Sequence, residues 1–407
     1  MKDIIFTLQT LQGDLIFYSK NNRLITYYLG GINMDMLVTH YRELHRFPEI
    51  SGTETRTPQY IVNELSKMHY NPQRIGNAGI IADLVMDPQL PWLLFRADID
   101  ALAIQENSCA AVQSEVPGAM HACGHDSHCA MLLEAARLLR DTQLPHNIRF
   151  LFQPAEETTK GAAEMIECGA LPRNLCACFA THVWPGIKKG VVATRPGALM
   201  ASSDVFQINV FGKSAHCAQS YLGADALQSA VEIVSSFSKI KATAEDPNTI
   251  LFCGSIHSGS SHNIVADAAS VSGTIRSFSA SDRKNIKALL TNSVSHVSHT
   301  AGIHAELRWD GGCPAIQNNK IIIDLLKQME PELITDVVPT MAAEDFACYQ
   351  EHAPGVMLWL GLGDVPPLHN EAFYVPEDVL HFGVELWIKI ATFDWSTALE
   401  NGCRTPN

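Results

Sequence analysis

The sequence predicts an α/β protein: a larger domain with a mainly parallel sheet flanked by helices, interrupted by a smaller α+β domain with an antiparallel sheet. Two observations lead to this fold class. Short, nearly continuous apolar runs alternate with helical stretches on both sides of the middle region, as in a parallel sheet that is buried on both faces. In the middle region, strands that alternate apolar and polar residues follow the order β-α-β-β-α-β, which is typical of an antiparallel sheet with helices on one face.

The larger domain begins with two helices and then alternates strands and helices. Apolar residues at helical spacing predict helices over 36–44 and 53–68. A third helix is predicted over 128–140, with Asp126 or Ser127 as its N-cap. Continuous apolar runs predict strands buried on both faces at 92–95, 148–152, 178–180 and 357–360.

The smaller domain has a different pattern. Its predicted strands alternate, and its predicted helices follow the first and third strands. We therefore expect strands at 205–211, 250–256, 269–277 and 304–309, with helices at 226–240 and 282–299. This domain is placed at 199–311, which divides the larger domain into 34–198 and 312–407. Residues 1–33, with strand-like pieces at 15–18 and 24–29, are expected to be a dispensable N-terminal extension that belongs to neither domain.

Composition narrows the function classes. The chain has 407 residues with 29 basic and 43 acidic side chains, so its formal charge of −14 disfavours a nucleic-acid partner. It contains no apolar run of 18 residues, so we expect no membrane span. No uninterrupted apolar core precedes Asp14, so no secretory signal is predicted. Its 11 cysteines are odd in number and follow no repeating spacing, which favours reduced thiols and a cytoplasmic location.

The densest group of chemically active residues lies at 120–128. It contains a thiol and three imidazoles, all of them potential metal ligands. Cys123 and His125 are two residues apart and cannot share a helix face, so we place them on the loop that enters the next helix, where Gly124 permits a sharp turn. The alternative is a polar loop with a buried thiol. It would be preferred for one isolated histidine, whereas a cluster favours a metal site.

Three further places put a ligand-type residue just after a predicted core strand. Glu156 and Glu157 follow the second strand, His182 the third and His369 the fourth. In open α/β sheets, the carboxyl ends of the strands form the edge where sites are built. Asp100 follows the first strand in the same way. It is interpreted either as a partner that orients a ligating imidazole or as an ordinary N-cap.

Together these motifs resemble the metal-dependent amidohydrolase and peptidase family that contains aminoacylases, hippurate hydrolases and indole-acetate–amino-acid hydrolases. The resemblance spans residues 36–393. Its motifs, in order, lie at 45–49 (HRFPE), 96–102 (RADIDAL), 120–128, 153–157 (QPAEE), 182–185 (HVWP), 212–216 (GKSAH), 263–265 (NIV), 273–276 (GTIR), 343–346 (AEDF) and 368–370 (LHN).

The resemblance implies a site and an architecture. It implies two divalent metal ions per subunit and makes Glu156 the general base for a water that both metals share. The smaller domain would be a lid and dimerisation surface, forming a homodimer or tetramer. On it, His216 would reach the substrate carbonyl, in the same chain or in a partner's site, while Asn263 and Arg276 would hold the substrate carboxylate. The implied metal ligands are Cys123, His125, Glu157, His182 and His369.

We therefore expect hydrolysis of the amide bond of N-acyl amino acids to a carboxylate and a free amino acid. Two alternatives remain: a dipeptidase or carboxypeptidase that uses the same metal site, and a non-catalytic binding protein, which the intact Glu156 disfavours. Thiolate, imidazole and carboxylate donors together suit manganese, zinc, cobalt and nickel.

Overall fold

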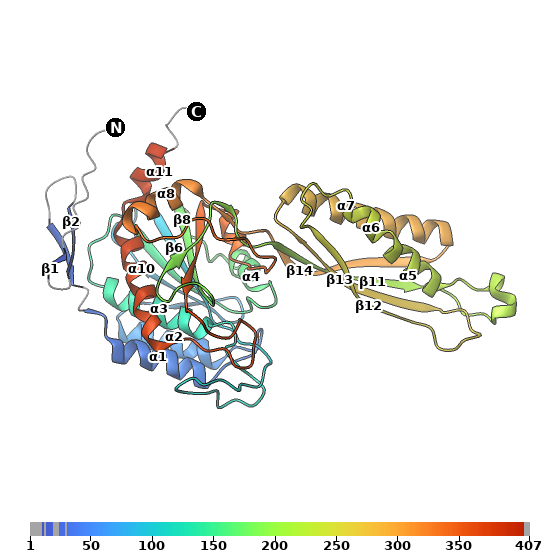
Figure 1. Ribbon diagram of the computed structural model, residues 1–407, viewed down its shortest axis with the longest axis horizontal. Helices are drawn as coiled ribbons and strands as arrows, with labels where there is room; N and C mark the ends of the chain where they lie inside the picture. Colours follow the sequence, from blue (N-terminus) through green and yellow to red (C-terminus); the bar gives the residue numbers. More distant parts are fainter. Residues whose placement is uncertain (1–9, 12–13, 19–23, 29–30, 403–407) are drawn as a thin grey trace.

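The computed structural model describes residues 10–11, 14–18, 24–28 and 31–402. Figure 1 shows two bodies arranged along the long axis: a broad one that contains β6, β8, α3 and α10, and a narrow one that contains β11 to β14 with α5 to α7. Within the described residues, no helix is long and apolar enough to cross a membrane.

The broad body contains a seven-stranded sheet in the order β4-β5-β7-β6-β8-β16-β9. Its four central strands, β7, β6, β8 and β16, run parallel, while β4, β5 and β9 are antiparallel to their neighbours. The mainly parallel sheet is thus confirmed. The strands are β4 (Gln73–Ile75), β5 (Gly79–Leu84), β6 (Trp92–Asp98), β7 (Asn147–Gln153), β8 (Leu175–Trp184), β9 (Val192–Ala193) and β16 (Gly355–Gly361).

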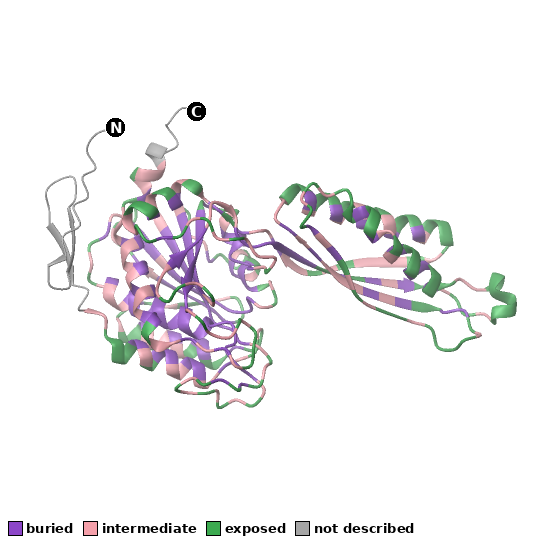
Figure 2. Ribbon diagram, in the orientation of Figure 1, coloured by how far each residue is buried: buried purple, intermediate pink, exposed green. Residues whose placement is uncertain are grey.

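The central strands are buried on both faces, which explains their continuous apolarity. On β6, Leu93 and Phe95 join one core cluster while Leu94 joins the other. The first cluster includes residues of α1 (Met34–Arg46), α2 (Arg56–Lys67), α3 (His125–Leu139), α8 (Lys320–Met329), α10 (Leu380–Thr392) and α11 (Trp395–Gly402). The second cluster includes residues of α4 (Gly161–Glu167) and α9 (Ala347–Gln350). Figure 2 shows the resulting layers, with a buried sheet between half-exposed helices.

The narrow body is a four-stranded antiparallel sheet in the order β12-β13-β11-β14. Its strands are β11 (Ser202–Phe211), β12 (Ile250–Ser258), β13 (Ala268–Ser277) and β14 (His304–Cys313), and α5 (Ala226–Ser235), α6 (Phe237–Lys241) and α7 (Ala280–Ala301) cover one face. The predicted element order is confirmed. β14 continues two residues beyond the end expected for this domain at 311. The domain limits themselves stay a prediction.

Two local predictions were wrong. The helix expected over 226–240 is interrupted at Ser236, whose hydroxyl donates to the carbonyl of Ile233 and so competes with the helix ladder. The third helix begins at His125, not after Asp126 or Ser127, and its N-cap is Gly124. Asp126 is instead the second residue of the helix, and its carboxylate contacts the ring of His45 and accepts the N–H of Ser127.

Short elements complete the chain. A small antiparallel sheet contains β1 (Thr10–Leu11), β2 (Asp14–Tyr18) and β3 (Leu24–Tyr28), which confirms the two strand-like pieces as far as they are described; residue 29 lies outside the described residues. The status of 1–33 as a separate extension stays a prediction. The remaining elements are β10 (Gly197–Ala198), β15 (Gln317–Asn318), η2 (Cys217–Leu222) and η3 (Glu377–Val379).

Candidate metal centre

The parallel strands bring four distant segments to one edge of the sheet. Glu156 and Glu157 follow β7, His182 lies near the end of β8, and His369 lies on the loop after β16. The N-terminus of α3 reaches the same edge and brings Cys123 and His125. The five predicted ligands, far apart in sequence, therefore meet at the carboxyl ends of the strands, where α/β sheets build their sites.

Two backbone features hold these loops in place. Gly124 has φ +83°, and a Cβ atom there would lie 2.4 Å from a methyl group of Val183, so only glycine fits this turn. His369 also has a positive φ of 63°, and its N–H donates to the carbonyl of Ala122 at 2.8 Å. The His369 loop is thus fastened directly to the segment that carries Cys123.

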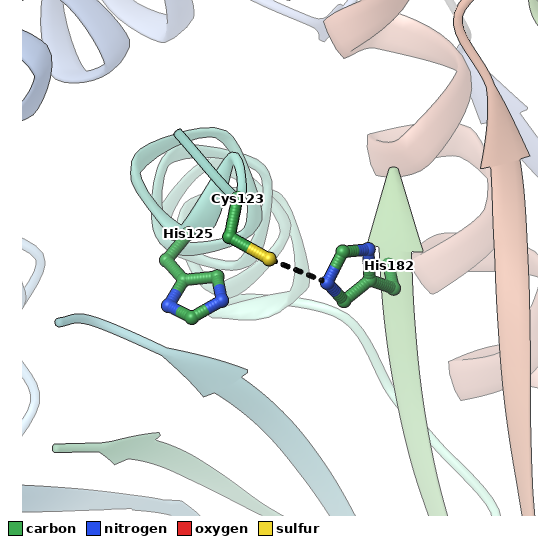
Figure 3. Close-up of side chains that lie close together, drawn as sticks. All are labelled: Cys123, His125 and His182. Carbon is green, nitrogen blue, oxygen red and sulfur yellow. Dashed lines mark hydrogen bonds between the residues drawn. The ribbon is translucent and has the colours of Figure 1, made fainter. Parts of the chain in front are cut away.

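The donor atoms of the five side chains face one another. The Cys123 sulfur lies 3.4 Å from His182 Nε2 and 3.3 Å from His369 Nε2 (Figure 3 shows the first contact). Glu157 Oε1 lies 3.4 Å from His369 Nε2 and 4.0 Å from His125 Nε2. The thiol therefore belongs to two overlapping donor sets, one with His125 and His182 and the other with Glu157 and His369. This arrangement suits a thiolate shared by two cations.

Hydrogen bonds at Nδ1 of two rings turn the Nε2 atoms of these rings toward the centre. His125 Nδ1 contacts Asp100 at 3.1 Å and His182 Nδ1 contacts the carbonyl of Val183 at 2.7 Å, so each ring keeps Nε2 for a ligand. Burial lowers the pKa of His182 well below its usual range, which favours the neutral imidazole that binds metals. His125 Nε2 and Glu157 Oε1 are buried without a hydrogen bond. Together with the donor types, these unsatisfied atoms fit divalent transition metals.

Asp100 has the contacts expected of a partner that orients a ligand. One oxygen accepts from His125 and the other accepts the N–H of Glu157 at 3.0 Å. It is not an N-cap, since α3 begins 25 residues later, at His125.

Glu156 is buried and its carboxylate lies close to those of Glu157, Glu344 and Asp345. Burial raises the pKa of Glu156 well above its usual range, and the charges of Glu344 and Glu157 raise it further. A carboxylate that holds a proton more tightly than usual is suited to general acid–base work near neutral pH. The neighbouring Glu157 points toward the ligands instead, so the two adjacent carboxylates have different surroundings.

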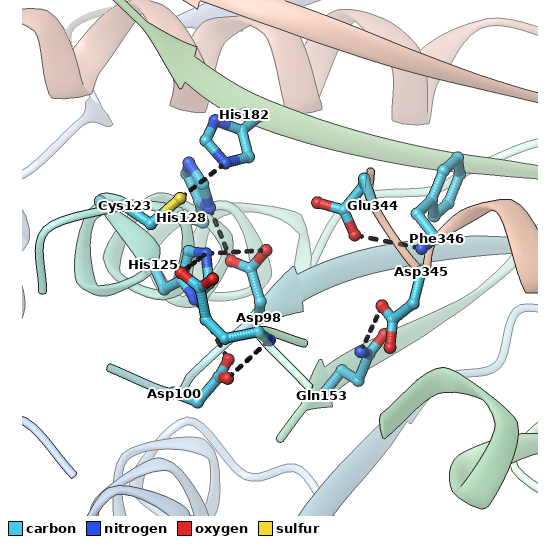
Figure 4. Close-up of polar contacts among 12 residues, drawn as sticks. Asp98, Asp100, Cys123, His125, His128, Gln153, His182, Glu344, Asp345 and Phe346 are labelled. Atoms are coloured by element: carbon cyan, nitrogen blue, oxygen red, sulfur yellow. Dashed lines mark hydrogen bonds and ion pairs between the residues drawn. The ribbon is translucent and has the colours of Figure 1, made fainter. Parts of the chain in front are cut away.

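The sequence did not reveal an ionic cluster beside Glu156, of which Figure 4 labels Asp98, Glu344 and Asp345. The Arg96 guanidinium is buried and contacts Asp98 at 2.7 Å, Glu344 at 2.9 Å and Asp345 at 3.0 Å. Gln153 adds hydrogen bonds to Arg96 and Asp345. The apolar neighbours of Arg96 on β6 were a usable signal, because an arginine inside a buried strand needs anionic partners.

Comparison with known proteins decides the family. The sequence profile described as peptidase family M20/M25/M40 matches residues 94–392. The chain belongs to this family. The N-acetyl-L-cysteine deacetylase of Bacillus subtilis is 34% identical, covering 83% of this chain and 83% of that protein. Thermostable carboxypeptidase 1 of Saccharolobus solfataricus is 33% identical, covering 86% of this chain and 93% of that protein.

A solved structure agrees with this assignment. A dinuclear metal-binding peptidase of the M20 family from Bacillus subtilis matches with a TM-score of 0.74 and 30% identity, over 88% of this chain and 99% of that one. This chain of the M20 family is a metal-dependent amidohydrolase, as expected from its motifs.

The three site residues that we predict on the smaller domain, His216, Asn263 and Arg276, do not lie together. His216 is exposed and pairs with Ile264, and the N–H of Cys217 donates to the carbonyl of Asn263 at 2.9 Å, so His216 and Asn263 share one loop cluster. Arg276 lies at the other end of β13, opposite Ser203, and its guanidinium reaches the carbonyl of Met341 at 3.4 Å.

The separation follows from the length of the strands. The ten residues of β11 span about 30 Å between Ser202, beside the catalytic domain, and Phe211, beside the loop of His216. Figure 1 agrees, since the segment 212–222, drawn in light green, lies at the far end of the narrow body. Of the three residues, therefore, only Arg276 lies at the end of the small sheet that adjoins its own catalytic domain.

Proposed function

We propose that this M20 hydrolase removes the acyl group from N-acyl amino acids and releases a carboxylate and a free amino acid. The observation that carries the proposal is the pair of adjacent carboxylates, with Glu157 among the ligand-type side chains and Glu156 buried beside them. The likeness to a deacetylase of N-acetyl-L-cysteine supports this substrate class. The likeness to a carboxypeptidase supports peptides as the second candidate.

Cys123, His125, Glu157, His182 and His369 would hold two divalent metals. When bound, these metals would polarise the amide carbonyl and make a water acidic near neutral pH. Glu156 takes the proton of that water and later gives it to the leaving amine nitrogen, which is the work of a general base that becomes a general acid. Asp100 orients the ring of His125 and fixes the backbone at Glu157.

We place His216 and Asn263 in the active site of a second copy. Their loop lies about 30 Å from their own catalytic domain along β11, whereas Arg276 stays beside it. In a homodimer formed through the lid domains, the partner would supply the His216 imidazole that stabilises the developing oxyanion. Asn263 of the same loop cluster would help to hold the substrate carboxylate. Arg276 would pair with the substrate carboxylate. We also place the enzyme in the cytoplasm, since the ten cysteines in the described part of the chain are all unpaired.

The decisive experiment compares an N-acetyl amino acid, its N-benzoyl analogue and a free dipeptide with the same C-terminal residue. Each is measured with manganese, zinc, cobalt or nickel. The proposal predicts a kcat/KM at least tenfold higher for one of the acylated compounds than for the dipeptide. A preference for the dipeptide with every metal would contradict it and favour the peptidase.

Subunit mixing tests the shared site. Homodimers of Glu156→Ala and of His216→Ala should both be nearly inactive. After random exchange, about half the dimers are mixed and each of these has one intact site, so about a quarter of wild-type activity should return. Activity that stays at the level of the unmixed variants would show that His216 acts within its own chain.

A further inference from the structure

His45 joins a long loop to the helix that carries the metal centre. Its Nδ1 lies 2.6 Å from Asp126 on α3 and its Nε2 lies 3.2 Å from Glu106 on the loop. All three side chains are buried. Although burial lowers the pKa of His45, hydrogen bonds with Asp126 and Glu106 raise it to about 10, so the ring is a cation between two carboxylates.

The loop spans residues 103–119 and is closed at its neck. Leu102 and Met120 exchange two backbone hydrogen bonds of 3.0 Å, which places the loop between Asp100 on one side and Cys123 on the other. Inside the loop, Glu106 also accepts from the hydroxyl of Ser108 and from the N–H of Ser114. The loop is therefore a compact unit that His45 fastens to the start of α3.

The same loop borders the open side of the centre. The side chain of His369 is 52% exposed, whereas those of Glu157 and His125 are 11% and 1% exposed, so the centre opens to solvent beside His369. The N–H of Asn107 donates to the carbonyl of Glu371, two residues beyond His369, at 2.8 Å. The loop thus forms one rim of this opening.

Composition and position indicate what the rim contacts. Residues 107–114 of the loop include no charged side chain, and Ala110, Ala111 and Val112 are small and apolar. Arg276, which we assign to the substrate carboxylate, contacts Met341 near Glu344, and Figure 4 shows Glu344 and Cys123 on opposite sides of Asp98. If the carboxylate of the substrate lies on the side of Glu344, the acyl end of the substrate faces the loop of residues 103–119.

We propose that the loop of residues 103–119 is the wall of the acyl pocket and sets the preference among uncharged acyl groups, with His45 as the positioning residue that holds it. This inference rests on the proposed function. The hydrogen bonds of His45 go to Asp126 and Glu106 and not to the five predicted metal ligands, so its replacement should leave metal binding intact. Acyl preference should change, because the loop loses its attachment to α3.

The test compares His45→Asn with His40→Asn, a matched control on the same helix. His40 is equally buried, but it contacts Tyr60 and not the loop. We expect His45→Asn to change the ratio of KM for N-benzoyl and N-acetyl substrates at least tenfold, with full metal content. Hydrogen exchange in 103–119 should quicken. His40→Asn should leave the ratio within twofold. If His45→Asn does not fold, Glu106→Gln and the exposed Ala111→Trp provide the same comparison.

Equal losses of kcat/KM for the N-benzoyl and N-acetyl substrates in His45→Asn would overturn the inference. Faster hydrogen exchange in 103–119 without a change in the ratio of the two KM values would also overturn it. Calorimetric binding of the two N-acyl amino acids to the metal-loaded protein separates this inference from the proposed function. If wild type turns over neither compound, the proposed function fails, and the loop is then judged by the ratio of dissociation constants in wild type and His45→Asn. Absence of binding by wild type would overturn both.

Discussion

His128 Nδ1 lies 2.6 Å from Asp98 Oδ1, and both side chains are buried beside the metal centre. The other ring nitrogen, Nε2, accepts the backbone N–H of Val183 at 2.9 Å. Because a backbone N–H can only donate, Nε2 carries no proton and Nδ1 must donate to Asp98. This imidazole has no free nitrogen for a metal. It fastens the end of β8, where His182 lies, to the end of β6.

Removing this connection should weaken metal binding without removing a ligand. His128→Phe loses both hydrogen bonds, so His182 is less well positioned, and we expect metal affinity to fall by about 10- to 100-fold. Chelator competition measures this directly. His40→Phe is the control, because His40 is also buried but its ring hydrogen-bonds to Tyr60 and not to a strand of the sheet. Unchanged affinity in His128→Phe would show that β8 needs no such support.

Cys123→Ser tests the shared thiolate. Serine is a poor substitute for a thiolate ligand, so we expect metal content after gel filtration to fall below one ion per subunit. The rise in melting temperature on metal addition should disappear with it. Cys129→Ser, on the helix that follows Cys123 and fully buried, should keep both properties. Two tightly bound metals in Cys123→Ser would contradict the bridging role.

The buried ionic cluster should be costly to break. Arg96→Met leaves Asp98, Glu344 and Asp345 without their cation, and we expect a loss of about 3–5 kcal/mol in the free energy of unfolding by urea. Arg46→Met removes a half-exposed arginine paired with Glu115 and should cost less than about 1 kcal/mol. Equal costs would show that the buried charges are stabilised by other groups.

The buried His146, which is not one of the predicted metal ligands, should make the folding stability sensitive to acid. Burial lowers the pKa of His146 to about 4, below its usual 6.5. Between these values the unfolded chain binds a proton that the folded chain does not, so stability falls as pH falls from 6.5 to 4, by about 3 kcal/mol. His146→Gln should lose this part of the pH dependence of urea unfolding, and the exposed His296→Gln should not. Identical pH curves for all three proteins would refute this assignment.

The strands were predictable because burial on both faces leaves a direct trace in the sequence. Leu93, Leu94 and Phe95 are all apolar since they face two cores in alternation. The break at Ser236 was not predicted, because the apolar pattern of α5 continues into α6 and the interruption depends on one local hydrogen bond.

The metal centre was predictable from ligand-type residues that follow core strands, since the ends of parallel strands meet at one edge. The cluster of Arg96 with Glu344 and Asp345 was not, because its members are about 250 residues apart and only the fold joins them. The separation of His216 from Arg276 likewise depends on their being at opposite ends of the small sheet, which no single motif reveals.

The most direct test of the proposed mechanism is turnover by Glu156→Gln at measured metal content. This substitution keeps the size of the side chain and leaves the five predicted ligands unchanged, but it removes the proton acceptor. We predict two metals per subunit, unchanged binding of an N-acyl amino acid and a kcat lowered by about 10²- to 10⁴-fold. Full turnover by a metal-loaded Glu156→Gln enzyme would contradict the account.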